Sequence, residues 1–173
     1  MNTFLPYPDY QRSAQVLDYR RLGKQRVEPK QVLAALRQGP KILYSPSSKI
    51  FLWKSNPSPD HVDLGLVVVR STPWYNHPCT RMWAGHERSL CEYALAMIRE
   101  WKRRGYCDNL EQWFQVERWL WSEQSVVYPW WLGCEDIHSS HRARLLYKDP
   151  TWYGQWGWTE TPRTDEEGYV WPV

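Results

Sequence analysis

Glu28 is the residue whose type and setting best suit chemistry, because it stands almost alone in a basic segment. Seven cationic side chains lie between positions 12 and 37, and the only carboxylates there are Asp18 and Glu28. The seven are Arg12, Arg20, Arg21, Lys24, Arg26, Lys30 and Arg37. A basic surface suits a polyanion such as nucleic acid, which a central carboxylate would repel. Glu28 therefore either orders the arginines by ion pairing or does chemistry on what they hold.

A second polar cluster, Asn76-His77-Pro78 with Arg81, precedes a helical pattern. Asn or His at a helix start can satisfy free backbone amides. The same side chains could instead contact a phosphate or a base. The sequence leaves both interpretations open.

Cys134, His138 and His141 lie at positions i, i+4 and i+7, so one helical face could present all three. A zinc site would need a fourth ligand, and the chain has no H-E-x-x-H and no C-x-x-C. We therefore predict no metal and no cofactor. His138 and His141, followed by Arg142, fit phosphate contacts on a helix face better.

Length and composition indicate one compact domain spanning residues 1–173. The formal net charge is only +3, so charge is informative through its clustering. Thirteen Trp and eleven Tyr exceed what a core needs, and large flat rings also suit stacking on bases or sugars. The N-terminus lacks the pattern of a signal peptide and no stretch reaches transmembrane length. Four widely spaced cysteines are best explained as free thiols of a cytoplasmic protein.

The elements that must position these residues are mainly helical. Residues 13–37 have helical periodicity that Gly23 and Pro29 interrupt, and a break near Pro29 would turn the Glu28 side chain off the helix surface. On this spacing one polar face would carry Arg21, Lys24, Gln25, Glu28 and Gln31.

Further helices are predicted over residues 81–104, with Gly105 as the C-terminal stop, and from about Asp136 to Asp149. Another should begin at Asp108-Asn109-Leu110-Glu111, which resembles a helix N-terminus with a capping acid. The helix after Asp108 carries an aromatic stripe that we assign to the core. Residues 38–73 form an excursion in which 49–54 and 64–69 could be short strands. The Trp-rich tail from residue 151 should wrap the body without regular structure. The predicted fold is therefore mostly α, a single compact helical domain with an irregular or short β insertion.

Several motifs together resemble the pyrimidine-dimer DNA glycosylase superfamily, of the phage endonuclease V kind. Residues 17–28, LDYRRLGKQRVE, are similar to its first helix. A bacterial branch of short proteins is similar over nearly the whole chain apart from 38–73. Its motifs match TFLPYPDY at 3–10, WYNHPCTRMW at 74–83, RRGY at 103–106, HSSHRARLLYKDPTWY at 138–153 and YVWP at 169–172.

The resemblance implies a catalytic glutamate at Glu28 and a histidine near the DNA at His77, with Asn76 beside it. The partner implied is double-stranded DNA carrying a modified base, with no membrane and no obligate protein partner. Expected DNA contacts are Arg20, Arg21, Lys24, Gln25, Arg26, Arg81, His138, His141 and Arg142. Expected base-pocket residues are Asp18, Trp74, Trp83 and Trp131.

The chemistry that follows is flipping and excision of a base, since a glycosylase cannot reach a base inside a duplex. Some bacterial relatives resemble antiviral glycosylases that remove glucosylated hydroxymethylcytosine from phage DNA, and a sugar-bearing base would suit Trp faces. Related bifunctional enzymes attack with the α-amine of a small residue exposed by methionine removal. Here residue 2 is Asn, after which methionine is usually retained.

Three alternatives stay open. The first is a pyrimidine-dimer glycosylase with AP lyase activity, which would form a trappable Schiff base. The second is a non-catalytic module that binds modified DNA, in which Glu28 only orders arginines. The third is a Trp-rich sugar-binding protein, against which the basic helices argue.

Overall fold

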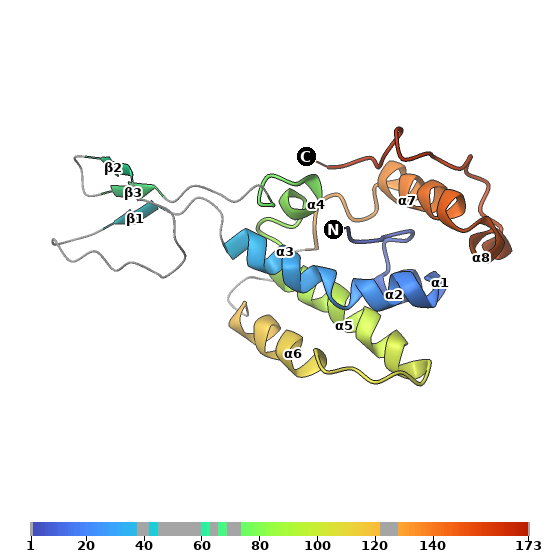
Figure 1. Cartoon of the computed structure of the whole chain (residues 1–173), viewed down its shortest axis with the longest axis horizontal. Coiled ribbons are helices and arrows are strands. Elements are labelled where there is room, and N and C mark those ends of the chain that lie inside the picture. The colour runs from blue at the N-terminus through green and yellow to red at the C-terminus, as the bar shows by residue number, and fades with distance from the viewer. Residues whose placement is uncertain are drawn as a thin grey trace.

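The structure is a computed structural model that describes residues 2–37, 74–121 and 128–172, together with the backbone of three short strands. The chain folds mostly into helices, as the periodicity predicts (Figure 1). The helices in the first half are α1 (Tyr10–Val16), α2 (Tyr19–Gln25), α3 (Glu28–Arg37) and α4 (Pro78–Arg81). Those in the second half are α5 (Glu87–Arg103), α6 (Glu111–Leu120), α7 (Glu135–Lys148) and α8 (Pro150–Tyr153), followed by the 3₁₀ turn η1 (Gly154–Trp156).

The predicted interruption of the first helical stretch is present, and a second one occurs earlier. The chain leaves α2 at Arg26 and re-enters a helix at Glu28, so that Pro29 takes a first-turn position where its missing N–H costs little. Asp18 starts α2 by accepting hydrogen bonds from the backbone N–H groups of Arg20 and Arg21. Gly23 does not interrupt α2; a Cβ there would lie 3.3 Å from the ring of Trp101, so close packing explains this glycine.

The later helices begin and end close to the predicted positions. α5 starts at Glu87 rather than residue 81, because a turn with Gly85 at φ +79° separates it from α4. Gly105 has φ +88° and ends α5 as predicted. Asp108 Oδ1 accepts from the amides of Leu110 and Glu111 at the start of α6, which is the expected capping acid.

The excursion contains three strands, β1 (Ile42–Tyr44), β2 (Asp60–Val62) and β3 (Leu66–Val68). They form an antiparallel sheet in the order β1-β3-β2, with residue 67 opposite residues 43 and 61. β3 falls inside the predicted run 64–69. The other predicted run, 49–54, lies outside the described residues.

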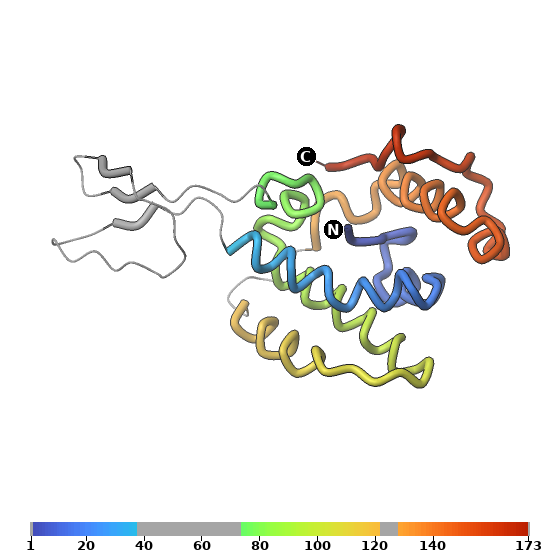
Figure 2. Tube along the Cα trace, viewed as in Figure 1, coloured from blue at the N-terminus to red at the C-terminus, as the bar shows by residue number. Residues whose placement is uncertain are grey.

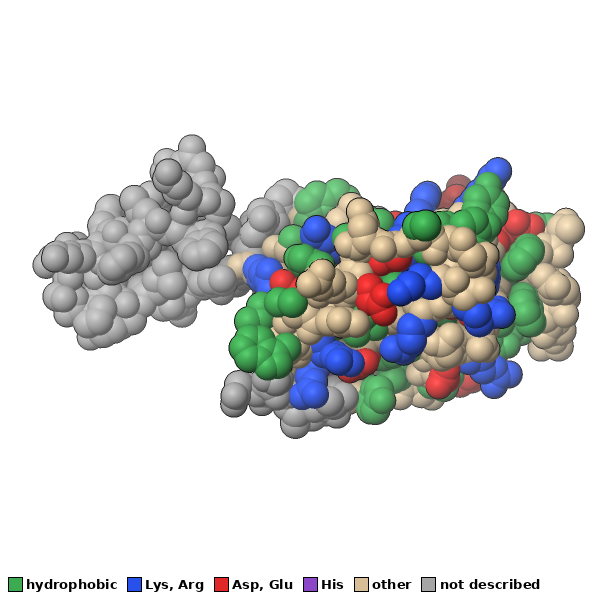
Figure 3. All heavy atoms as spheres, turned by 90° about the horizontal axis from the view of Figure 1, so that it is seen from below, with side chains coloured by type: hydrophobic (Ala, Val, Ile, Leu, Met, Phe, Trp, Pro, Cys, Tyr) green, Lys and Arg blue, Asp and Glu red, His purple; other side chains and the backbone are tan. Residues whose placement is uncertain are grey.

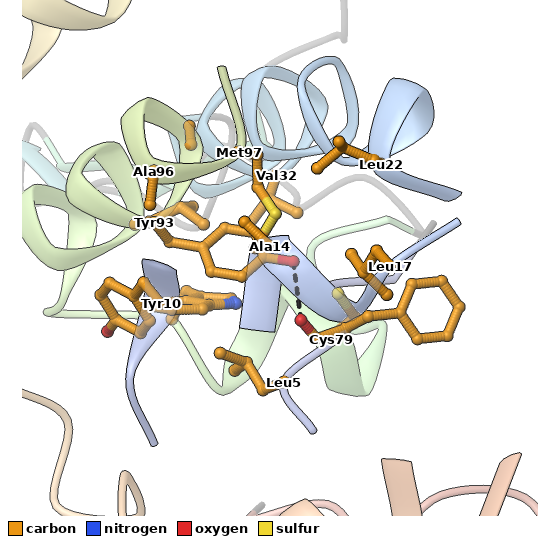
Figure 4. Packing of buried hydrophobic residues seen from close by; sticks show 14 of the residues in the cluster. Leu5, Tyr10, Ala14, Leu17, Leu22, Val32, Cys79, Tyr93, Ala96 and Met97 are labelled. Carbon is orange, nitrogen blue, oxygen red and sulfur yellow. Dashed lines mark hydrogen bonds between the residues drawn. The ribbon is translucent and has the colours of Figure 1, made fainter. Parts of the chain in front are cut away.

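The core is built around α5, which packs against α1, α2, α3 and α6. Its buried side chains recur every three or four residues, as the periodicity predicts, from Leu90 through Tyr93 and Met97. Figure 4 shows Tyr93 in the middle of this core, close to side chains of the N-terminal segment such as Leu5. The aromatic stripe of α6 belongs to the core as predicted, with Phe114 buried and Trp113 and Trp121 packed against the buried cluster. Leu120, which the sequence assigns to the same face, is exposed, and its assignment to the core was wrong.

The N-terminal segment before α1 runs between the α2–α3 region and α7, as the trace in Figure 2 shows. Phe4 donates its backbone N–H to Gln25 on one side, and Leu5 bonds two histidines of α7 on the other. Residues 151–156 are in α8 and η1, which corrects the prediction that the tail lacks regular structure from residue 151. After η1 the tail has no regular structure and crosses α7, where Val170 N–H bonds the hydroxyl of Ser140. No helix in the described ranges is long and apolar enough to cross a membrane.

Candidate active site

Glu28 stands at the first position of α3, where its carboxylate is fixed by two N–H donors. Its Oε2 accepts a 2.9 Å hydrogen bond from the backbone N–H of Asn2 and a 3.0 Å bond from Nε2 of Gln25. A carboxylate in the first turn of a helix is also favoured by the helix dipole. Both recorded bonds reach the same oxygen, which leaves Oε1 for a ligand.

Gln25 is fully buried and orients Glu28 rather than reaching DNA. Its Oε1 accepts from the N–H of Phe4 at 3.0 Å and from the hydroxyl of Tyr93 at 2.6 Å. These donors fix the amide so that Nε2 faces the carboxylate, which can only accept. The prediction that Gln25 contacts DNA is therefore wrong, because the break after α2 puts its side chain in the core.

Glu28 lies on the wall of a pocket of about 1000 Å³ formed by α2, the end of α7, α8, the N-terminal segment and the tail. Its other carboxylates are Asp18, Asp149 and Asp165, and its aromatic side chains are Phe4, Tyr19, Tyr106, Trp152 and Tyr169. Its cations are Arg20, Arg21, Lys24, Arg104, Arg144 and Lys148. A smaller hollow of about 470 Å³ lies along α2 and α3, and both Glu28 and Lys24 line it as well.

The cations expected at this site are either exposed or held in ion pairs within the protein. Arg20 and Lys24 are exposed on α2. Arg21 pairs with Asp18 at 2.6 Å, and Arg26 pairs with Asp108 and lies 4.4 Å from the ring centroid of Trp101. One face of the molecule shows Lys and Arg interspersed with Asp and Glu rather than a single large basic field (Figure 3). A polyanion would therefore contact individual exposed cations, whereas Arg21 and Arg26 are held in ion pairs within the protein.

Asp18 lines the pocket, but its oxygens are already occupied. Oδ1 caps α2, while Oδ2 accepts from Arg21 and from the hydroxyl of Tyr153 at 2.6 Å. Burial alone would raise the pKa of Asp18, but the hydrogen bonds from Tyr153 and Arg21 outweigh it and the pKa is lowered. Asp18 therefore shapes the pocket wall as an ionised cap.

The structure does not bring Asn76 and His77 into the Glu28 pocket, since neither lines it. His77 caps α4, its Nδ1 accepting from the N–H of Cys79 at 3.2 Å, and Asn76 is exposed. Partial burial lowers the pKa of His77, which favours the neutral ring that this acceptor role requires. The two sites are neighbours through Cys79, because Glu28 is among the charges that raise the pKa of that buried thiol, after burial itself. The capping interpretation of His77 is confirmed.

Two other residues of the same motif are exposed. The Trp74 ring lies 5.9 Å from that of His77, centroid to centroid, and is 56% exposed. Arg81, at the end of α4, is exposed too. Both are available to a ligand that reaches beyond the pocket.

His138, His141 and Arg142 are buried, which corrects their assignment as phosphate contacts. His138 accepts from the N–H of Gly133 through Nε2 at 3.0 Å, so its Nδ1–H faces the carbonyl of Leu5 at 2.8 Å. His141 Nδ1 accepts from the N–H of Leu5 at 3.3 Å. Burial lowers the pKa of His138, and it lowers that of His141 to about 3.

Arg142 holds three segments together. It pairs with Glu135 and Glu160 and donates to the carbonyl of Pro6 at 2.8 Å. The sequence predicts phosphate contacts on this face of α7, but the N-terminal segment and the tail cover it. The buried polar side chains of α7 use their hydrogen bonds and ion pairs to hold those two segments.

Trp83 and Trp131 are core residues, which corrects their assignment to a base pocket. Their rings lie 5.1 Å apart, edge to face, and their N–H groups donate to Thr3 Oγ1 and to the carbonyl of Met82. The tryptophan that does line the pocket is Trp152 of α8. The resemblance drew attention to the nitrogen of residue 2, but no spacing along the chain indicates that this nitrogen donates to Glu28.

In the part of the chain that the structure describes, no group of His, Cys, Asp and Glu is arranged to hold a metal ion. The four cysteines are unpaired, so neither a metal nor a disulfide explains their positions. The polar groups of the site are the Glu28 carboxylate with its N–H donors, the other pocket carboxylates and the surrounding cations.

The helical body thus presents a carboxylate, fixed by two N–H donors, at a pocket lined by cations. The chain matches the family described as pyrimidine dimer DNA glycosylase over residues 1–113, which include the N-terminal segment and α1 to α5. It belongs to this family, so its general activity is that of a pyrimidine-directed DNA glycosylase with DNA as substrate. No curated protein and no solved structure matches the chain.

Proposed function

We propose that the protein excises a modified pyrimidine from DNA with Glu28 as the catalytic carboxylate. The base we favour is glucosylated hydroxymethylcytosine in phage DNA, and its removal would leave abasic sites that block phage replication. The observation that carries the proposal is the Glu28 carboxylate on the pocket wall, held by Asn2 and Gln25.

The held carboxylate suits cleavage of an N-glycosidic bond. As the bond from sugar C1′ to the base breaks, the base leaves with the electron pair and the sugar becomes oxocarbenium-like. Glu28 stabilises this cation and accepts a proton from the water that attacks C1′, while the departing base takes up a proton. The two N–H donors keep the carboxylate in place before the substrate arrives, so little reorganisation is needed.

The pocket favours a bulky base over an unmodified one. Its volume of about 1000 Å³ is at the upper end of the range for pockets that hold drug-sized molecules. Trp152 and Tyr169 supply aromatic faces, and Asp149 supplies a carboxylate that can accept from sugar hydroxyls. Stacking on the sugar of a modified base would therefore involve Trp152, and not Trp83 or Trp131, which lie in the core.

Exposed cations would bind the backbone of the flipped strand. Arg20 and Lys24 on α2 and Arg81 after His77 are exposed in positions that suit phosphate contacts. Such contacts can offset the few kcal/mol that flipping a base costs. Exposed Trp74 is available to stack on a neighbouring base.

A second candidate is a pyrimidine-dimer glycosylase that also cleaves the strand, and one observation favours it. The nitrogen of Asn2 is 2.9 Å from Glu28, so removal of Met1 would put a free α-amine beside the carboxylate. With Met1 retained, this nitrogen is a peptide N–H that donates but cannot attack C1′. We therefore propose hydrolysis by water, without a lyase step.

A base-release assay tests the proposal. Purified protein is incubated with DNA carrying glucosylated hydroxymethylcytosine, with unmodified DNA and with UV-irradiated DNA; abasic sites are counted with an aldehyde-reactive probe and released bases are identified by mass spectrometry. Abasic sites confined to the glucosylated DNA are expected. Sites confined to irradiated DNA would support dimer repair instead. Binding without any base release would leave the module that only binds modified DNA.

A further inference from the structure

Arg144 and Lys148 lie one turn apart on α7 and face the same carboxylate, Asp165 of the tail. Arg144 forms an ion pair with Asp165 and donates to the carbonyl of Arg163 at 2.7 Å. Lys148 Nζ lies 3.8 Å from the Asp165 oxygen that Arg144 binds. The Arg144 side chain is 3% exposed, whereas that of Asp165 is 77% exposed. A buried cation is thus neutralised by a carboxylate that solvent can reach from nearly all sides.

Further positive charge acts on this position from α2. Arg21, Lys24, Arg144 and Lys148 all line the Glu28 pocket. Burial lowers the pKa of Lys148, and the charge of Arg144 lowers it further, with smaller contributions from Arg21 and Lys24 against the opposing effect of Asp165. The positive charges on α2 and α7 therefore repel one another across the pocket.

In the described ranges, the ion pairs of these four cations involve only two carboxylates, Asp18 and Asp165. Arg21 is neutralised by Asp18, and Asp165 is shared between Arg144 and Lys148. Within the described ranges Lys24 has no ion pair. One exposed carboxylate therefore serves two cations, with a third unpaired cation on the same pocket.

We infer that Arg144, Lys148 and Lys24 form a binding site for a DNA phosphate, and that Asp165 occupies this site until DNA displaces it. The inference rests on the proposed function, because the phosphate belongs to the strand whose base enters the Glu28 pocket. A guanidinium and two ammonium groups match a phosphodiester well, since each donates charge-assisted hydrogen bonds to its oxygens. Arg144, Lys148 and Asp165 lie beyond residue 113, where the family match ends, so membership of the family does not supply this site.

The site requires little rearrangement to open. The recorded side-chain contacts of Asp165 are those to Arg144 and Lys148, so rotation of one exposed side chain frees the cations. Arg144 stays in place through its bond to the Arg163 carbonyl and its position 5.3 Å from the ring centroid of Tyr169. The carboxylate is thus an internal competitor of the phosphate.

Competition predicts opposite effects of two charge-removing variants. Lys148→Gln removes a phosphate ligand and should weaken DNA binding. Asp165→Asn removes the competitor and should tighten it. The matched controls are Glu166→Gln, which alters an exposed carboxylate next in the chain, and Lys102→Gln, which alters a lysine that pairs with Glu111 outside the pocket.

The experiment is fluorescence anisotropy with a short duplex that carries a tetrahydrofuran abasic-site analogue, measured over a range of KCl concentrations. The slope of log K against log [salt] should become shallower by about one in Lys148→Gln, the effect of one lost phosphate contact, and should be unchanged in Lys102→Gln. Asp165→Asn should tighten binding by roughly two- to five-fold and Glu166→Gln by clearly less. Thermal unfolding confirms that each variant is folded.

Specific outcomes would overturn the inference. A wild-type salt slope in Lys148→Gln would show that Lys148 does not contact a phosphate. Equal effects of Asp165→Asn and Glu166→Gln on DNA affinity would show that Asp165 does not compete with the phosphate. The proposed function fails separately, if DNA is bound with the predicted variant effects but no base is released. Wild-type protein that binds no DNA contradicts both.

Discussion

The backbone nitrogen of Asn2 and the carboxylate of Glu28 are joined by a 2.9 Å hydrogen bond, although 26 positions separate them in the chain. The bond ties the N-terminal segment to the start of α3 and fixes the carboxylate at the pocket. The same nitrogen would be a nucleophile if it were the chain terminus. The chemistry at Glu28 thus depends on whether one residue precedes Asn2.

Glu28→Gln should abolish base release while DNA binding is kept. Glutamine can still accept from Asn2 and Gln25, so the geometry survives and only the negative charge and the basic oxygen are lost. The turnover should fall by about 10²–10⁴-fold, as measured by the abasic-site assay alongside duplex binding. Glu111→Gln, which removes a carboxylate paired with Lys102 on α6, should retain wild-type turnover. Normal excision by Glu28→Gln would refute the assignment.

Gln25→Met should lower both stability and turnover. The side chains are similar in size, but methionine leaves the buried N–H of Phe4 without its acceptor and removes one donor from Glu28. It also takes one of two acceptors from the Tyr93 hydroxyl, which keeps the carbonyl of Phe4. The free energy of unfolding in urea should fall by about 1–3 kcal/mol. Because the carboxylate is less well fixed, the turnover of the folded variant should fall. KM should change little.

The control for this variant is Gln15→Met, since Gln15 is exposed on α1 and changes in the same way chemically. It should alter neither quantity. Wild-type turnover in folded Gln25→Met would show that Gln25 does not position Glu28.

Asn2→Thr should introduce strand cleavage. A small residue at position 2 allows removal of the initiator methionine, and the resulting α-amine would take the position now 2.9 Å from Glu28. Borohydride should then trap a covalent protein–DNA adduct with abasic DNA in the variant and none in the wild type. Intact mass spectrometry reports the N-terminal residue of each protein. A trapped adduct in wild-type protein that lacks Met1 would favour the dimer-repair alternative.

Acidification should destabilise the protein through His141 before the carboxylates titrate. Burial holds the folded pKa of His141 at about 3, while in the unfolded chain it returns to about 6.5. Between these values the unfolded state binds the proton, so the free energy of unfolding falls as the pH falls through about 6.5. The slope contributed is at most about 1.4 kcal/mol per pH unit. His138, whose pKa is also lowered by burial, acts in the same direction.

Thermal unfolding at pH 7.5 and pH 5.5 measures this effect. His141→Gln keeps an acceptor for the N–H of Leu5 but cannot titrate, so its stability should change less between the two pH values. The same pH dependence in His141→Gln and wild type would contradict the buried neutral imidazole.

The sequence by itself determined the helical class and most helix ends, and it singled out Glu28 as the candidate catalytic carboxylate. Helical periodicity, Gly105 and the cap at Asp108 are local signals, because a helix is set by residues three and four apart and by its ends. The break before Pro29 is local too, since proline restricts the residue before it. The family motifs added Glu28 and its surroundings, and the family match over residues 1–113 agrees with them.

Only the tertiary structure decided which polar residues are exposed and which are buried and hold the fold together. Gln25, His138 and Arg142 resemble surface ligands in a linear pattern, yet the N-terminal segment and the tail cover them and use their hydrogen bonds. Trp83, expected in a base pocket, lies in the core, whereas Trp152, to which the sequence assigned no role, lines the pocket. Burial depends on what a distant segment packs against, and the hydrogen bond from Asn2 to Glu28 forms only when the chain closes over 26 positions. Spacing along a chain contains no record of such contacts.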